Sequence, residues 1–302
     1  MIGISVIMPT FNRGYCIEKT IESVIMQTYP SWELIVVDNN SSDNTRDIVS
    51  GLSDERISFF QVNNQGVIAI SRNFGIARAR GEYVAFIDSD DPWVEDKLEV
   101  AIDYLSRGNR LVFHDLMVFN GKDKLNVRKQ RLARSLHKPI VRDLLERGNG
   151  IPTSSVVVEK RLLDDVGAFK EKSSLVGIED YDLWVRIARE TDKFCYIDRV
   201  LGYYTDDGSG TLNLALRERS LRGIINEHKE LHIAMCGKTP DWLVVAWTRC
   251  LLSGNSHKAC RYALSYLRER RSFVAVIKLL CIAAVAFMRI SFGFLGKSSR
   301  GN

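Results

Sequence analysis

Three aspartates, Asp88, Asp90 and Asp91, crowd into four consecutive positions, with Ser89 between the first two. Carboxylates this close repel one another, and a bound cation relieves that repulsion. Mg²⁺ or Mn²⁺ can supply the charge, because such ions bind one or two carboxylates together with substrate phosphates. A metal that bridges two phosphates also stabilises a departing diphosphate. The alternative is an aspartate-rich turn in which Asp91 caps a helix starting at Pro92.

The elements that must position this cluster alternate between strand-like and helix-like patterns. Short apolar runs predict buried strands, and apolar residues at helical spacing predict the helices between them. The predicted strands of the first half are 4–8, 33–37, 57–61 and 83–87, with helices near 17–25, 45–52, 67–79 and 94–105. The second half predicts helices at 141–147 and 180–189 and strands at 154–158, 194–197 and 201–204. This alternation predicts an α/β fold with a mainly parallel, doubly wound sheet.

Polar residues follow three of the predicted strands. The first strand leads into Pro9, Thr10, Phe11, Asn12 and Arg13. Asp38 ends the second strand, and the cluster at 88–91 follows the fourth. Parallel sheets of this kind bind ligands outside the carboxyl ends of their strands. We therefore expect the three polar segments to converge on one site.

Three side chains near these ends have types that suit a nucleotide. Asp38 can accept hydrogen bonds from a base or a ribose, although a turn-forming role is as common. Phe11 can stack on a base, but the residue alone is also typical of a core aromatic. Arg72, in a predicted helix beside the site, can reach a base or phosphates, or it can be a solvated helix residue.

An acidic pair, Glu179 and Asp180, opens the helix predicted at 180–189. Acids in the first turn usually stabilise the helix dipole, and the pattern alone favours that role. A carboxylate in this place can also act as a general base. His228 and His232 are four positions apart, but residue 229 is lysine where a metalloprotease motif has glutamate, so we interpret both as helix-surface residues.

Composition is that of a globular protein, with 302 residues and a net charge of +5. The six cysteines form no CxxC pair, which is typical of buried thiols in a reducing cytosol rather than of a zinc or disulfide framework. We predict a catalytic domain at 1–211 and a helical region at 212–302. Basic residues accumulate beyond Arg249, and without a nucleic-acid-binding signature they favour a membrane surface as the partner.

An apolar segment at 273–295 lies within this basic tail. It is long enough to span a bilayer only if Lys278 and Arg289 are tolerated, and positive charge flanks it on both sides. An interfacial helix on the cytoplasmic leaflet is the preferred interpretation, which would make the protein cytoplasmic and peripheral on the inner face of the membrane. A core helix packed on the catalytic domain is the alternative.

Seven motifs in order resemble the family 2 glycosyltransferases, which have the A-type glycosyltransferase fold. They are Ser5–Arg13, Leu34–Asp38, Asn64–Val67, Arg72–Gly75, Gly81–Asp91, Val166–Phe169 and Glu179–Trp184. Members of the family transfer a sugar from a nucleotide diphosphate, most often UDP, to an acceptor hydroxyl with inversion at the anomeric carbon. The resemblance implies a nucleotide sugar donor, Mn²⁺ or Mg²⁺, a glycan or lipid-linked glycan acceptor, and a role in cell-surface polysaccharide synthesis.

The resemblance also assigns roles. It places Phe11 against the base, Asp38 and Arg72 on the nucleotide, Asp88 on the ribose and metal side, and Asp90 on the metal. It makes Asp180 the catalytic base. Further candidates, toward the acceptor or completing the site, are Glu179, Asp91, Trp184, Asp206 and Asp207.

One departure concerns the segment around Asp206 and Asp207, where relatives often carry a histidine near the metal. Either these acids substitute for the histidine, or the loop closes differently. Two other functions remain possible from the residues. A nucleotidyltransferase would need a glycine-rich basic loop, whereas the first polar segment is followed by Gly14 only. An inactive nucleotide-sugar binder or scaffold would not need both Asp90 and Asp180.

Overall fold

The structure, a computed structural model, describes residues 3–119, 127–205, 223–237, 277 and 280. The chain divides into two compact units, Met1–Gly237 and Lys238–Asn302. The predicted domain boundary near residue 211 lies outside the described residues, as does nearly all of the second unit. Within the described part, no helix has the length and apolar character that crossing a bilayer requires.

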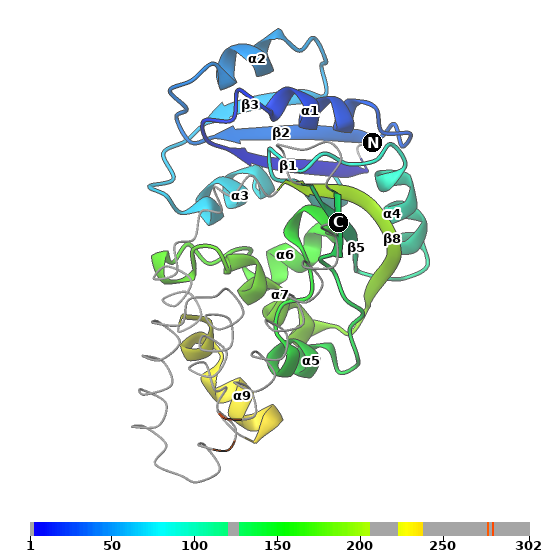
Figure 1. Cartoon of the computed structure of the whole chain (residues 1–302), viewed down its shortest axis with the longest axis vertical. Helices are drawn as coiled ribbons and strands as arrows, with labels where there is room; N and C mark the ends of the chain where they lie inside the picture. The colour runs from blue at the N-terminus through cyan, green and yellow to red at the C-terminus, as the bar shows by residue number, and fades with distance from the viewer. Residues whose placement is uncertain (1–2, 120–126, 206–222, 238–276, 278–279, 281–302) are drawn as a thin grey trace, which may run out of the picture. The chain divides into compact units, whose positions relative to one another are not determined.

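An eight-stranded sheet forms the centre of the first unit, in the order β3-β2-β1-β4-β7-β5-β6, with β8 also paired to β5 (Figure 1). The strands are β1 (Ile4–Thr10), β2 (Trp32–Asp38), β3 (Ile57–Gln61), β4 (Tyr83–Phe86), β5 (Leu111–Phe119), β6 (Val127–Arg131), β7 (Val157–Glu159) and β8 (Phe194–Thr205). Strands β1 to β4 are parallel, as are β5 and β8, whereas β7 runs antiparallel to β4 and β5. The predicted α/β fold with a mainly parallel sheet is confirmed.

Helices cover both faces of this sheet. The described helices are α1 (Ile17–Ile25), α2 (Thr45–Gly51), α3 (Ile68–Ile76), α4 (Lys97–Ser106), α5 (Ile140–Arg147), α6 (Lys160–Val166), α7 (Glu179–Glu190) and α9 (Lys229–Cys236), with the short 3₁₀ turns η1 (Thr153–Ser155) and η2 (Ser173–Leu175). One apolar cluster joins the sheet to α1, α2 and α4, and another joins it to α3, α5, α6 and α7. Every residue of β1 and β2 is buried, which is why their sequences are apolar runs without alternation.

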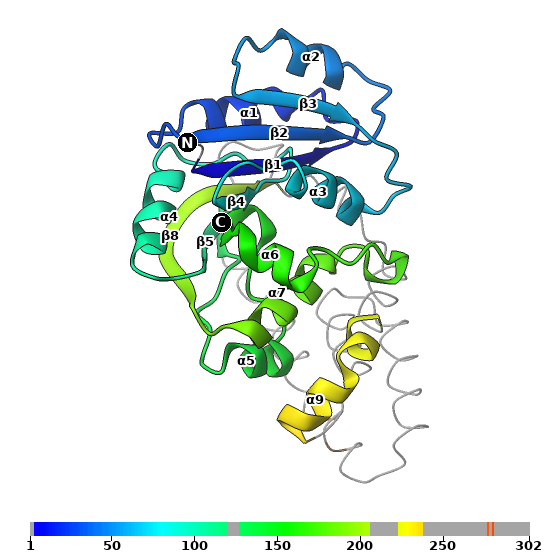
Figure 2. The same ribbon diagram turned by 180° about the vertical axis from the view of Figure 1, so that it is seen from behind.

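The second half of the sheet differs from the prediction. Strands β5 and β6 and helix α6 were not predicted, and β8 is one twelve-residue strand where two short strands were expected. The pairing of β8 with β5 shifts register near His114 and Asp115, opposite the polar residues Asp198 and Arg199 that interrupt the apolar pattern of β8. In Figure 2, β8 curves beside α4, with which it is in contact.

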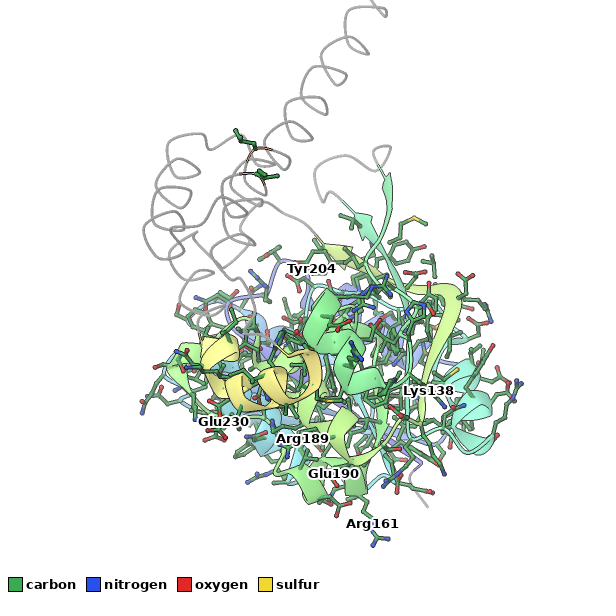
Figure 3. All side chains as sticks on the ribbon, turned by 90° about the horizontal axis from the view of Figure 1, so that it is seen from below. Lys138, Arg161, Arg189, Glu190, Tyr204 and Glu230 are labelled. Carbon is green, nitrogen blue, oxygen red and sulfur yellow. The ribbon has the colours of Figure 1, made fainter. Side chains whose placement is uncertain are left out.

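Many charged side chains away from the site lie on the surface, where water solvates them. Figure 3 labels examples on several elements, including Arg161 on α6, Arg189 on α7 and Glu230 on α9, all of which are exposed. Buried charges are therefore the informative ones.

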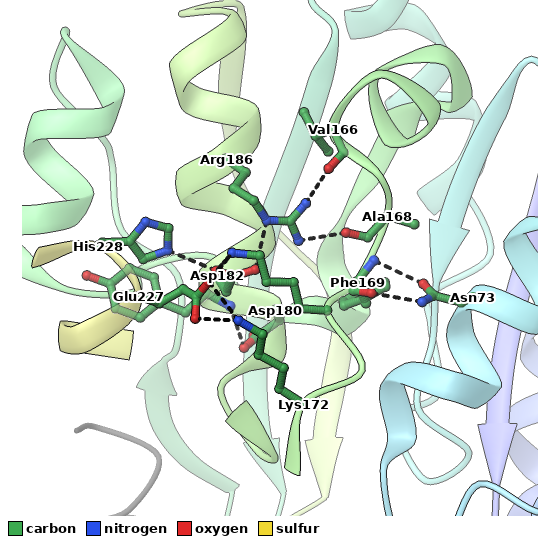
Figure 4. A network of polar contacts seen from close by, with 12 residues as sticks. Asn73, Val166, Ala168, Phe169, Lys172, Asp180, Asp182, Arg186, Glu227 and His228 are labelled. Atoms are coloured by element: carbon green, nitrogen blue, oxygen red, sulfur yellow. Dashed lines mark hydrogen bonds and ion pairs between the residues drawn. The ribbon is translucent and has the colours of Figure 1, made fainter. Parts of the chain in front are cut away.

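A buried carboxylate in α7, Asp182, is surrounded by basic groups (Figure 4). It accepts hydrogen bonds from Arg186 Nε at 2.8 Å and His228 Nε2 at 2.9 Å, and Lys170 Nζ lies 3.4 Å away. Arg186 also donates to the carbonyl oxygens of Val166 and Ala168. The network thus ties α7 to the segment before it and to the residues before α9.

This network corrects the interpretation of two histidines. His228 and His232 are only 6% and 5% exposed and are not helix-surface residues. Burial of Asp182 opposes its charge, but the hydrogen bond from His228 and the charge of Arg186 outweigh burial and lower its pKa to about 2. The folded state therefore favours the ionised carboxylate.

We expect Asp182→Asn to reduce the free energy of unfolding by about 3 kcal/mol at pH 7, because it removes the charge of a buried carboxylate that Arg186 and His228 both contact. A pKa of about 2 lies below the ordinary value of 3.8. The stabilisation is present above the ordinary value and is lost as pH falls through the folded one. Urea unfolding from pH 7 to pH 2 should show a weaker acid dependence for the variant.

Asp103→Asn is the matched control, because Asp103 and Arg107 also form an ion pair four positions apart, but an exposed one. It should change the unfolding free energy by less than about 0.5 kcal/mol. Equal losses in the two variants would contradict the role given to Asp182.

Candidate active site

The loops after β1 and β2 are bound to each other. The Asn12 backbone N–H donates to Ser41 Oγ at 2.8 Å, and the Ser42 N–H donates to Asn12 Oδ1 at 2.8 Å. Asn12 has a φ of 50°, a left-handed conformation that asparagine tolerates better than most residues. Asn12, which makes the turn after β1, thus bonds the loop after β1 to the loop after β2. These bonds bring together the two strand ends that were predicted to converge.

Asp38, at the end of β2, is fully buried. It accepts hydrogen bonds from the Ser41 N–H at 3.0 Å, from the Ser41 hydroxyl and from Gln61 Nε2 at 3.2 Å. These donors fix the orientation of the carboxylate, which retains capacity for further bonds because an ionised carboxylate has about four acceptor positions.

The β1 end offers an exposed ring and a buried hydroxyl. Phe11 is 53% exposed, so it is not a core aromatic and its ring is available for stacking. Thr10 is buried, and its Oγ1 has no hydrogen-bond partner among the described residues. Pro9 lies within β1, paired in register with Val37.

The aspartate loop after β4 is anchored by Asp91. This buried carboxylate accepts hydrogen bonds from Ser154 Oγ at 2.7 Å and from the Thr205 N–H at 3.0 Å. Burial raises the pKa of Asp91 well above its usual value, and the charges of Asp88 and Asp90 add to that rise. The interpretation of Asp91 as a helix cap is wrong, because α4 begins only at Lys97, where Asp96 is the cap residue.

Asp88 and Asp90 each face an arginine. Arg13 Nη2 lies 3.5 Å from Asp90 Oδ2, and Arg72 Nη2 lies 2.9 Å from Asp88 Oδ1. The Asp88 N–H donates to Ser154 Oγ, which holds the loop beneath the two side chains. Ser89 is buried, and its carbonyl oxygen accepts a hydrogen bond from Cys16 Sγ. Ser89 therefore helps to hold the aspartate loop through its backbone.

These two carboxylates suit a divalent cation that also binds phosphate. Within the described residues, no three His, Cys, Asp or Glu side chains are arranged to hold a metal by themselves. Mg²⁺ sites with substrate phosphates need only one or two carboxylates, and Asp88 and Asp90 meet that requirement. Asp206 and Asp207 lie outside the described residues.

Arg72 is buried in α3, with 4% of its side chain exposed. Its Nη1 lies 2.5 Å from Glu179 Oε1, while Nη2 contacts Asp88. Burial alone would lower the pKa of Arg72, but the charges of Asp88, Glu179 and Asp180 outweigh it and raise the pKa above its usual value. Arg72 is therefore not a solvated helix residue, because it is buried and its two terminal nitrogens contact carboxylates. Its contact with a nucleotide stays a prediction.

The neighbours of Arg72 fix its helix against the sheet. Asn73 Nδ2 donates to the Phe169 carbonyl oxygen at 2.8 Å, and the Phe169 N–H donates back to Asn73 Oδ1 at 2.9 Å. A side chain at Gly75 would meet Ile7 of β1 at 2.6 Å, so the close approach of α3 to β1 requires glycine. In the motif Arg72–Gly75, Arg72 is thus the site residue, and Asn73 and Gly75 hold its helix in position.

Asp180 stands in the first turn of α7, partly exposed. Its Oδ2 accepts hydrogen bonds from Thr153 Oγ1 at 2.9 Å and Asn149 Nδ2 at 3.1 Å, and its Oδ1 accepts from the Tyr181 N–H at 2.7 Å. Burial and the neighbouring charge of Glu179 raise its pKa to about 6, against the lowering effect of Arg72. A carboxyl with this pKa can take up a proton near neutral pH.

Trp184 does not belong to an exposed acceptor site. It is fully buried, and its ring lies 6.2 Å from that of Phe86 and 6.5 Å from that of Phe169. Trp184 lies on the apolar face of α7, so packing explains why a tryptophan is present in the motif Glu179–Trp184.

Three contributing residues were not predicted. Asn149 and Thr153 orient Asp180, and Ser154 holds Asp88 and Asp91. They lie in and before the short turn η1, where the sequence has no periodic pattern. No signal in the sequence could have assigned them to the site.

The sequence of the chain is similar to those of known glycosyltransferases. Residues 5–167 match the family model described as Glycosyl transferase family 2. The chain is 33% identical over 192 residues to the UDP-Glc:alpha-D-GlcNAc-diphosphoundecaprenol beta-1,3-glucosyltransferase WfgD of Escherichia coli, covering 63% of this chain and 71% of that protein. It is 44% identical over 104 residues to the putative teichuronic acid biosynthesis glycosyltransferase TuaG of Bacillus subtilis, covering 34% of this chain and 41% of that one.

Two solved structures share the fold. S. aureus TarS 1–349 in complex with UDP-GlcNAc gives a TM-score of 0.61 at 20% identity, covering 97% of this chain and 92% of that one. The mannosyltransferase PcManGT from Pyrobaculum calidifontis, in complex with GDP-Man and Mn²⁺, gives 0.57 at 22% identity, covering 94% and 80%. The match over more than half of its length shows that the chain belongs to glycosyl transferase family 2.

Proposed function

We propose that the chain is an inverting, metal-dependent glycosyltransferase that moves a sugar from a nucleotide diphosphate, UDP in the first instance, to an acceptor hydroxyl. The observation that carries the proposal is the position of Asp180 together with its pKa, which is raised to about 6. Its neighbour Glu179 contacts Arg72, and Arg72 in turn contacts Asp88, so Asp180 and Asp88 belong to one site.

Asp180 acts as the general base. It accepts the proton of the acceptor hydroxyl while that oxygen forms a bond to the anomeric carbon and the bond to the leaving diphosphate oxygen breaks. Thr153 and Asn149 hold one of its oxygens in place. Attack from the face opposite the leaving group inverts the configuration at that carbon.

The nucleotide occupies the ends of β1 and β2. Phe11 stacks on the base, and Asp38 accepts its hydrogen bonds or those of the ribose. Asp88 and Asp90 would hold Mn²⁺ or Mg²⁺, which would neutralise the developing charge of the diphosphate. Arg13 is placed to contact a phosphate, because its guanidinium already lies beside Asp90.

The acceptor is a glycan or lipid-linked glycan of a bacterial cell-surface polysaccharide. Support comes from the names of the relatives, one of which acts on a sugar attached to diphosphoundecaprenol and another of which is assigned to teichuronic acid biosynthesis. An inactive binder or a nucleotidyltransferase would show no sugar transfer from a panel of nucleotide sugars with Mn²⁺, and that assay separates the three functions.

The enzyme acts at the inner face of the membrane, where a lipid-linked acceptor is found, and binds there through 273–295. Of that segment, the structure describes Ile277 and Leu280, both helical and 45% and 63% exposed. Exposed apolar residues beside basic ones suit an interfacial helix.

Asp180→Asn should lower turnover by about 10²–10⁴-fold, the usual contribution of general-base catalysis, with little change in nucleotide affinity. The wild-type rate should rise with pH through about 6, because the base must be ionised. Steady-state transfer assays and calorimetric titration with UDP measure the two quantities. Full activity in the variant would exclude Asp180 as the base.

Asp90→Ala should abolish the dependence of nucleotide binding on Mn²⁺, because it removes a metal ligand. Titration of UDP with and without Mn²⁺ measures this dependence. Asp96→Ala, which removes an exposed partner of Arg199 in the same loop, is the control and should leave it intact. Undiminished metal dependence in the Asp90 variant would rule out the ligand assignment.

A chain ending before Ser272 should lose sedimentation with anionic lipid vesicles, whereas the full chain should sediment with them. Added salt should weaken binding of the full chain, because basic residues contribute to it. Equal sedimentation of both proteins would contradict the proposed membrane segment.

A further inference from the structure

Arg72 is shared between two carboxylates from distant parts of the chain. Asp88 follows β4 and Glu179 begins α7, 107 positions from Arg72. Both contacts are short, at 2.9 Å and 2.5 Å. The side chains of Arg72 and Glu179 are 4% and 7% exposed, whereas Asp88 is 34% exposed. Asp88 is thus the member of the group that remains accessible to a ligand.

The charges of this group do not cancel. Two carboxylates share one guanidinium, so the group carries a net charge of −1. Glu179 is held by a second bond, in which the Gly177 N–H donates to its Oε2 at 2.6 Å. Glu179 therefore adds a negative potential at Asp88 that offsets part of the positive potential of Arg72, so that carboxylate is incompletely neutralised.

We propose that Glu179 is a positioning residue that acts through Arg72 to keep Asp88 negative enough to bind a divalent cation. The inference rests on the proposed use of Mn²⁺ or Mg²⁺ at Asp88 and Asp90. Without Glu179, Arg72 pairs fully with Asp88 and repels a cation there. Without both Arg72 and Glu179, the net charge of −1 returns.

Two roles for Glu179 predict different effects of substitutions on cation binding: adjusting the charge at Asp88, or only supporting the structure of the site. In the first case, Glu179→Gln weakens cation binding, Arg72→Gln strengthens it, and the double variant lies near the wild type. In the second case, every variant weakens binding, and the double variant is the worst. Opposite signs for the two single variants are therefore the diagnostic result.

The experiment titrates the full chain with Mn²⁺ in the presence of saturating UDP, because Asp88 and Asp90 complete a metal site only together with phosphate oxygens. Electron paramagnetic resonance measures the free ion, and Mn²⁺ added to UDP without protein is the blank. Glu179→Gln should raise the Kd for Mn²⁺ about tenfold, the scale expected from one charge near a partly buried divalent ion. The double variant should return to within about threefold of the wild type. Circular dichroism checks that each protein is folded.

Glu33→Gln is the matched control. Glu33 is also a buried glutamate paired with an arginine, since Arg80 Nη2 lies 2.6 Å from its Oε2. It sits near the start of β2, at the opposite end of the strand from Asp38. Its substitution should leave the Kd for Mn²⁺ unchanged.

The outcomes separate this inference from the proposed function. A wild-type chain that binds no Mn²⁺, with or without UDP, overturns the proposed metal dependence. Wild-type binding with no change in Glu179→Gln overturns the role of Glu179 alone, as does a double variant as weak as that single variant. If Glu179→Gln does not fold, the double variant is compared with Arg72→Gln, and it must bind Mn²⁺ more weakly by the same factor.

Discussion

The buried guanidinium of Arg72 is the interaction on which the arrangement of the site depends. A charge removed from water costs several kcal/mol unless partners compensate it closely. Its partners come from the end of β4 and the start of α7, so the charge is tolerated only where the sheet and that helix bring both carboxylates to it. The assembled site therefore requires that both the sheet and α7 are folded.

Much of the surrounding structure serves to hold that contact. Asn73 exchanges hydrogen bonds with the backbone of Phe169, and Gly75 lets α3 lie close to β1. On the other side, Asp182 and Arg186 bind α7 to Val166 and Ala168, the same short segment. The residues between α6 and α7 are thus bonded to α3 through Asn73 and to α7 through Arg186. This explains why these two polar side chains point toward the segment rather than to solvent.

The sequence alone predicted the parts of the site that depend on local pattern. Apolar runs that end in Asp38 and Asp88 marked two strand ends, and the parallel topology brought them together. It could not predict that Arg72 is buried, because the identity of a helix residue does not reveal which carboxylates a distant segment supplies. The role of Asp91 was missed for the same reason, since Ser154 and Thr205 lie 63 and 114 positions away. β5 was missed although it has apolar residues on both sides of His114 and Asp115, because those two polar residues interrupt the run.

The bonds between β8 and the aspartate loop have a mechanical consequence. Tyr203 donates its N–H to the Pro92 carbonyl oxygen, and Val94 donates to that of Leu201. Thr205 binds both Asp91 and the Asp90 carbonyl oxygen. The last residues of β8 therefore brace the loop, and a displacement of Thr205 would also displace Asp90 and Asp91.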